Sequence, residues 1–101
     1  MPKPKPKVTA QDAVAARAYF ADFEGLEHLR VRPRADLLIV ESGPDDEPIP
    51  HARLRRVTAQ TWQIEMATHT ERWENTHERG PLRLLLQALV DLYGWTLAPR
   101  E

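Results

Sequence analysis

The spacing of hydrophobic positions changes along the chain, and each change predicts a different kind of element. In residues 10–25 apolar side chains recur every three or four residues, the spacing of one helix face, at Ala13, Ala16, Phe20 and Phe23. Thr9 followed by Asp12 has the form of a capping box, in which two side chains bind free backbone amides, and Gly25 can end the helix. We therefore predict an N-terminal helix over this segment.

From residue 28 onward apolar positions alternate with polar ones, which is typical of strands that are buried on one side. This alternation, together with one nearly continuous apolar run, predicts four strands, at residues 28–33, 37–42, 51–57 and 61–67. The second of them is apolar enough to lie centrally in a sheet. A tight turn at residues 33–36 and an exposed loop at residues 43–50, rich in prolines and acids, are the expected links.

Residues 80–94 return to helical spacing, with Pro81 in the first turn and Gly94 as the C-terminal stop. The expected buried stripe is Leu82, Leu85, Leu86, Leu89 and Tyr93. Residues 95–97 are expected to add a last short strand. This order predicts an α+β two-layer sandwich, with an N-terminal helix, a four- to five-stranded antiparallel sheet and a C-terminal helix, both helices covering one sheet face.

A length of 101 residues indicates one domain, which we place at residues 9–99. We expect a disordered tail before it, at residues 1–8, where proline and lysine alternate. The absence of cysteine excludes a thiol nucleophile, a zinc–thiolate site and a disulfide framework, and it suits a reducing compartment. No apolar stretch approaches the roughly 20 residues that span a bilayer, and no apolar segment follows the N-terminal charges. We expect a cytoplasmic protein with no membrane partner.

Arginine makes up most of the positive charge of this chain. The three lysines are confined to the N-terminal tail, and the other eleven basic residues are arginines. Strand alternation turns one set of basic residues away from the core: His28, Arg30, Arg32, His51, Arg53 and Arg55. Because the planar arginine fork matches phosphate oxygens, one hypothesis is a phosphate-binding or nucleic-acid-binding sheet face formed by Arg30, Arg32, Arg53 and Arg55.

Two features of the sequence weigh against that hypothesis. Sheets that bind RNA interleave aromatic residues that stack on bases, whereas the aromatic residues here are expected in the core or on helices, with Trp73 as the exception. Glu41, Glu65 and Glu74 are also expected near the same face, where they would neutralise it through cross-strand pairs. The alternative is a solvated, salt-bridged sheet face or one used for self-association, and a net charge of −1 attracts no polyanion by itself.

The segment from residue 68 to residue 79, "THTERWENTHER", nearly repeats itself and holds His69 and His77. Zinc hydrolases place two histidines one helical turn apart with a glutamate between them, whereas these two are eight residues apart. A metal-dependent enzyme using His69 and His77 is therefore the weakest reading. We favour a structural role, with residues 70–74 as a strand that buries Trp73 and residues 75–80 as the connection into the last helix.

Other catalytic patterns are absent from the sequence, which has neither a G-x-S-x-G elbow nor a glycine loop that could cradle phosphates. We expect no cofactor and no enzymatic activity.

Three segments echo the layout of a known family: "ARLRRVTAQTWQIEM", "ERWE" and the leucine-rich helix ending at "YGW". From about residue 29 to residue 96 the chain resembles a family of small bacterial proteins described only as a domain of unknown function. In that family aromatic residues follow the first tryptophan, where this chain has residues 63–65, and a histidine usually follows the basic–Trp pair, where this chain has Glu74. The resemblance implies no activity.

We therefore expect a non-catalytic module that binds an unknown protein partner or assembles into a homo-oligomer. Unpaired edge strands and one uncovered sheet face favour association. Binding of nucleic acid or another phosphate ligand through the arginine face is the alternative.

Overall fold

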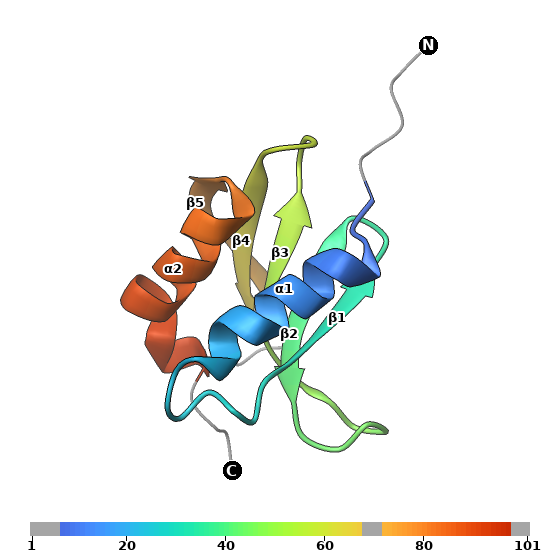
Figure 1. Ribbon diagram of the computed structural model, residues 1–101, viewed down its shortest axis with the longest axis vertical. Coiled ribbons are helices and arrows are strands. Elements are labelled where there is room, and N and C mark those ends of the chain that lie inside the picture. Colours follow the sequence, from blue (N-terminus) through green and yellow to red (C-terminus); the bar gives the residue numbers. More distant parts are fainter. Residues whose placement is uncertain (1–6, 68–71, 98–101) are drawn as a thin grey trace.

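The computed structural model describes residues 7–67 and 72–97, except the side chains of residues 95 and 96, and shows two helices on one face of a five-stranded sheet (Figure 1). The elements follow in the order α1 (Ala10–Ala21), β1 (Arg30–Arg34), β2 (Leu37–Ser42), β3 (Ile49–Arg56), β4 (Trp62–Ala67), β5 (Trp73–Gly80), α2 (Leu82–Tyr93) and the 3-10 helix η1 (Gly94–Leu97). Each strand pairs antiparallel with the next, so the sheet order equals the chain order. The predicted α+β sandwich is confirmed.

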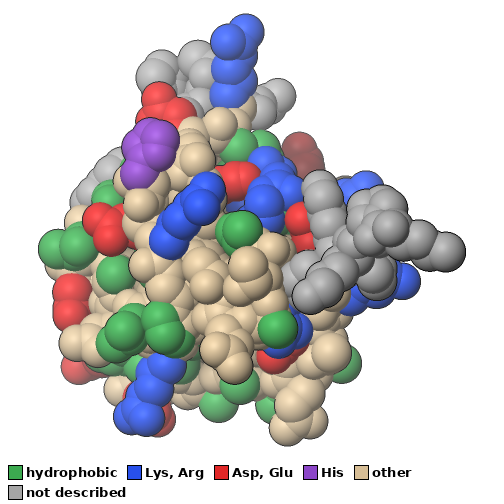
Figure 2. Space-filling view, turned by 90° about the horizontal axis from the view of Figure 1, so that it is seen from above, with side chains coloured by type: hydrophobic (Ala, Val, Ile, Leu, Met, Phe, Trp, Pro, Cys, Tyr) green, Lys and Arg blue, Asp and Glu red, His purple; other side chains and the backbone are tan. Residues whose placement is uncertain are grey.

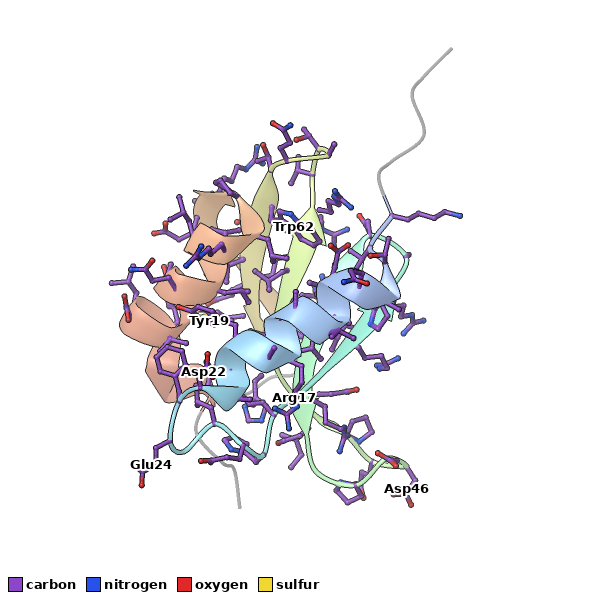
Figure 3. All side chains as sticks on the ribbon, in the orientation of Figure 1. Arg17, Tyr19, Asp22, Glu24, Asp46 and Trp62 are labelled. Carbon is purple, nitrogen blue, oxygen red and sulfur yellow. The ribbon has the colours of Figure 1, made fainter. Side chains whose placement is uncertain are left out.

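The hydrophobic core fills the space between the sheet and the two helices. Alternate residues of β2, β3 and β4 point into it, and Leu38, Leu54 and Ile64 are fully buried. Phe20 of α1 and Leu89 of α2 close it from the helix side, and Trp62 lies on this side as well (Figure 3). Because each buried side chain of this size contributes roughly 1.5–3 kcal/mol, the two periodicities read from the sequence identify the residues that stabilise the fold.

The capping box at the start of α1 is present as predicted. Thr9 Oγ1 accepts a hydrogen bond from the Asp12 backbone amide at 3.2 Å, and the Thr9 amide donates to Asp12 Oδ2 at 2.9 Å. The helix ends at Ala21 and does not continue to Gly25. The backbone amides of Asp22 and Phe23 donate three residues back, which tightens the last turn and stops the α-helical pattern.

The predicted tail of residues 1–8 lies largely outside the described residues, which begin at Lys7. Of this tail, Val8 belongs to the fold, because its backbone amide donates to the Ala35 carbonyl in the turn between β1 and β2 at 2.9 Å. The Lys7 carbonyl likewise accepts a hydrogen bond from Arg56 at 3.1 Å. Residues 7 and 8 therefore make hydrogen bonds with the domain that the sequence analysis placed at residues 9–99.

The prediction that residues 75–80 form a connection is wrong, since β5 runs through them to Gly80. The strand accommodates them through a bulge: Gln63 pairs with Arg79 and Glu65 with Asn75, so β5 has two more residues than β4 between these pairs. Thr76 Oγ1 donates to the Ile64 carbonyl at 3.0 Å. Threonine often occurs in turns, but the Thr76 side chain here takes the place of a backbone hydrogen bond that is missing between β4 and β5. The sequence pattern alone does not reveal this arrangement.

The prediction of a short strand at residues 95–97 is also wrong. Gly94 keeps right-handed helical angles, so the chain continues from α2 into the 3-10 helix and carries Leu97 into the core, where it is fully buried. No helix in the described ranges 7–67 and 72–97 is long and apolar enough to cross a membrane.

Candidate interaction surface

The sheet face opposite the helices, here called the open face, carries two rows of side chains that run across the strands. One row is Arg34, Leu37, Arg55, Gln63 and Arg79, and the other is Arg32, Ile39, Arg53, Glu65 and Asn75. Glu41 and Trp73 belong to the same face, because each lies two residues along its strand from a member of the second row. Neither α1 nor α2 covers this face (Figure 1).

The structure brings the four arginines of the sequence hypothesis to this face, and each meets an acidic group. Arg32 Nε donates to Glu41 at 2.9 Å, and Arg30 lies 3.6 Å from Asp45 and also donates to the Gly43 carbonyl. The remaining two arginines converge on one carboxylate, that of Glu65, as described next. The predicted neutralisation of the arginines by cross-strand carboxylates is confirmed for Glu41 and Glu65.

Glu65 is the centre of the ion-pair network on the open face. Its carboxylate, only 9% exposed, accepts from Arg53 at 3.2 Å and from Arg55 at 3.1 Å. Arg55 also donates to Asp36 at 3.0 Å. Burial lowers the pKa of Arg55, but its hydrogen bonds and charge interactions with Glu65 and Asp36 outweigh this, and the pKa is raised above its ordinary value.

Two further arginines stand at the ends of the first row. The guanidinium groups of Arg34 on β1 and Arg79 on β5 are exposed, and neither makes an ion pair or hydrogen bond to any residue that the structure describes. The sequence hypothesis omitted both. Arg34 follows Arg32 by two residues in the same alternation, so extending the first strand by one residue would have found it.

A hollow of about 540 Å³ opens on this face beside β2, here called the arginine hollow. Its lining combines apolar and basic groups: Leu37, Ile39, Pro48, Pro50, Trp73, Arg32, Arg34, Arg53 and Glu41. Trp73, the aromatic residue that the sequence left open for this face although one strand reading buried it, lies half-buried here, and the Arg53 guanidinium stands 4.3 Å from its ring centroid. That distance is a cation–π contact, which holds the indole against the sheet.

The sequence prediction that the side chains of His28 and His51 point away from the core is wrong. His51 is fully buried, and its Nε2 lies 2.7 Å from the Ser42 hydroxyl. His28 Nε2 lies 2.7 Å from the Leu97 carbonyl, and the two imidazole centroids are 5.8 Å apart. The reason is a bulge: Val40 pairs with Ala52 but Glu41 pairs with Pro50, so His51 is an extra residue whose side chain leaves the alternation.

Of the two candidate metal ligands, His69 lies outside the described residues. His77 is exposed on the β5 bulge, where its φ is 65° and its backbone amide donates to Asn75 Oδ1 at 2.7 Å. Within ranges 7–67 and 72–97 no group of three or more histidine or acidic side chains could hold a metal ion. The metal hypothesis therefore gains no support from the described geometry.

Comparisons with protein-family models, with curated proteins and with solved structures gave no match for this chain. The resemblance to the bacterial family of unknown function therefore stays a prediction, and the function has to be argued from the open face itself.

Proposed function

We propose that the domain works by binding another protein chain through its open face. The observation that carries this proposal is the pairing of the arginines. Glu41, Glu65 and Asp36 together balance the charges of three arginines, Arg32, Arg53 and Arg55. Arg34 and Arg79 are the arginines of this face that lack an acidic partner among the described residues, which is little positive charge for a surface that binds a polyanion. Figure 2 likewise shows basic and acidic side chains interspersed, not gathered by sign, at the end of the molecule that it displays.

The chemistry of the arginine hollow fits a protein partner. Arginine and tryptophan are enriched at the centres of protein–protein contacts, and lysine is depleted there. This face has the same bias, since Trp73 and several arginines lie on it and the lysines occur only at positions 3, 5 and 7. Leu37 and Ile39 supply an apolar floor that a partner's side chain can cover.

A photo-reactive amino acid at position 34 tests the proposal. In cells, this variant is expected to cross-link to protein, whereas a matched variant at Leu84 is not, because that exposed residue lies on α2 on the helix side. The cross-linked product is identified by mass spectrometry, and a second copy of the chain counts as protein. Equal cross-linking from both positions, or none from position 34, would refute binding through the open face.

Nucleic-acid binding is the second candidate, and it is favoured by the aromatic ring of Trp73 and by the guanidinium groups of Arg34 and Arg79, which have no partner among the described residues. Arg53 and Arg55 are poor residues to test, because changing them leaves Glu65 without its partners. Arg34→Gln combined with Arg79→Gln removes two free charges and no described ion pair. If the candidate holds, affinity for mixed oligonucleotides falls in this variant and falls steeply with salt in the native chain.

A further inference from the structure

An acidic loop adjoins the arginine hollow. Residues 43–48 join β2 to β3, and the three consecutive acids Asp45, Asp46 and Glu47 are all exposed. Asp45 lies 3.6 Å from Arg30, but Asp46 and Glu47 make no ion pair with the residues described. Figure 3 shows Asp46 at the far end of this loop, projecting away from the sheet and both helices.

The acidic loop is shaped before any partner arrives. Gly43 takes a φ of 83°, and the Glu47 amide donates to the Pro44 carbonyl at 3.1 Å, closing a turn. Prolines at positions 44 and 48 restrict the backbone on either side of the acids. A segment fixed in this way loses little conformational entropy on binding.

The hollow therefore has a cation, Arg34, at one end of β2 and the acidic loop at the other end, and Arg34, Asp46 and Glu47 have no ion-pair partner among the described residues (Figure 1). Arg34 lines the arginine hollow, and Pro48, the last residue of the acidic loop, lines its wall. No ion pair links Arg34 to Asp46 or Glu47 within the described part of one chain. Opposite charges at the two ends of one face make that face self-complementary, which is what a two-fold symmetric contact requires.

We propose that the occupant of the arginine hollow is the acidic loop of a second copy of this chain. A two-fold axis between the loop and the hollow places each loop on the other molecule's hollow, so Asp46 of each copy meets Arg34 of the other. In the same contact, the partner's loop covers the apolar floor of the hollow, which Leu37 and Ile39 form. This inference rests on the proposed function, that the open face binds protein, and it names the partner.

Charge reversal tests this arrangement in solution. Sedimentation equilibrium of the native chain is expected to show a mass that rises with concentration from 11.6 kDa toward twice that value. Arg34→Glu alone, or Asp46→Arg alone, is expected to weaken association about 25-fold, because losing one exposed pair costs about fivefold and symmetry counts it twice. Both residues are exposed and lack described partners, so both variants should fold.

Mixing the two variants provides the decisive measurement. In a heterodimer of Arg34→Glu with Asp46→Arg, one contact is native and the other carries the reversed pair. The mixture is therefore expected to associate as the native chain does, although each variant alone associates more weakly. The double variant is expected to associate with itself for the same reason. Matched control changes are Arg17→Glu and Glu24→Arg, which alter charge equally on α1 and the turn after it (Figure 3) and should leave association unchanged.

Three outcomes would overturn the inference: a native chain that stays at 11.6 kDa at every concentration, an association that neither variant weakens, or a mixture that does not recover. A monomeric native chain whose position 34 still cross-links to other proteins would end this inference and leave the proposed function standing. A concentration-dependent dimer with no cross-links from position 34 would remove both, since the contact would then lie elsewhere.

Discussion

The ion-pair network at Glu65 makes a quantitative prediction about stability. Its carboxylate is 9% exposed and accepts from two arginines, Arg53 and Arg55, which are 20% and 35% exposed. Replacing either arginine by methionine keeps an unbranched side chain about as long as the arginine's aliphatic stem and removes the guanidinium charge, but leaves the carboxylate with one cationic partner. Each single change is therefore expected to lower the free energy of unfolding by about 1–1.5 kcal/mol. This value lies at or below the smallest contribution usual for a hydrogen bond to a charged group, because both arginines are partly exposed to water.

Removing both arginines has a larger effect than the sum of the single changes. The Glu65 charge then stands buried and unpaired, which costs about 3–5 kcal/mol. Changing Glu65 to methionine in that double variant is expected to recover most of the loss, because an apolar side chain at this position needs no partner. Arg34→Met, which breaks no described contact, is the matched control and should change stability by less than about 0.5 kcal/mol.

Urea unfolding followed by tryptophan fluorescence measures these differences, since Trp62 is 3% exposed in the folded chain and reports its loss. If the two single changes add to the double change within about 0.5 kcal/mol, the two arginines do not share one buried carboxylate, and the reasoning fails.

Three further changes test local features of the fold. Thr9→Ala removes the cap of α1 and is expected to lower the free energy of unfolding by about 1 kcal/mol, measured by thermal melting; an unchanged melting temperature would show that the cap contributes nothing. The Glu27 carboxylate accepts hydrogen bonds from its own amide and that of Gly25, which hold its pKa below the ordinary value of a glutamate. Its stabilising contribution is therefore present above its unfolded pKa and lost as pH falls through the folded one, and a carboxyl titration by NMR with an ordinary midpoint would contradict this. His51→Leu leaves the buried Ser42 hydroxyl without its imidazole partner and should cost about 1–3 kcal/mol in urea unfolding, whereas Ser42→Ala should cost less.

The sequence predicted the elements that depend on local periodicity. The first helix follows from apolar spacing and the Thr9–Asp12 capping box, and the second from the leucine stripe that Leu85, Leu86 and Leu89 bury. Strand alternation placed Arg30, Arg32, Arg53 and Arg55 on one face correctly, because neighbouring strands keep the same pleat. These features are encoded within a few residues of each other, so a sequence pattern is sufficient to find them.

The sequence could not predict where a strand departs from its own pattern. The bulge at His51 turns a residue expected in solvent into a buried one, and the bulge before Arg79 lets residues 75–78 stay within a strand. A bulge is a property of two strands in register, so it is fixed by pairing with β2 or β4 and leaves no periodic signal in β3 or β5. Trp73 lies on the open face because it is two residues from Asn75 along β5, and this placement became certain only with the register of β4 and β5.

The sequence by itself determined that this chain folds as an α+β sandwich with arginines on the sheet face away from the helices, because helix and strand periods decide which side chains can be buried. Only the tertiary structure decided which arginines lack an acidic partner among the described residues. Arg53 and Arg55 meet Glu65 because the strand register sets them together, whereas Arg34, at the opposite end of β2 from the exposed acids of the 43–48 loop, meets no described partner. Charge counts along a chain cannot distinguish these cases, since pairing depends on distances between residues that are remote in sequence.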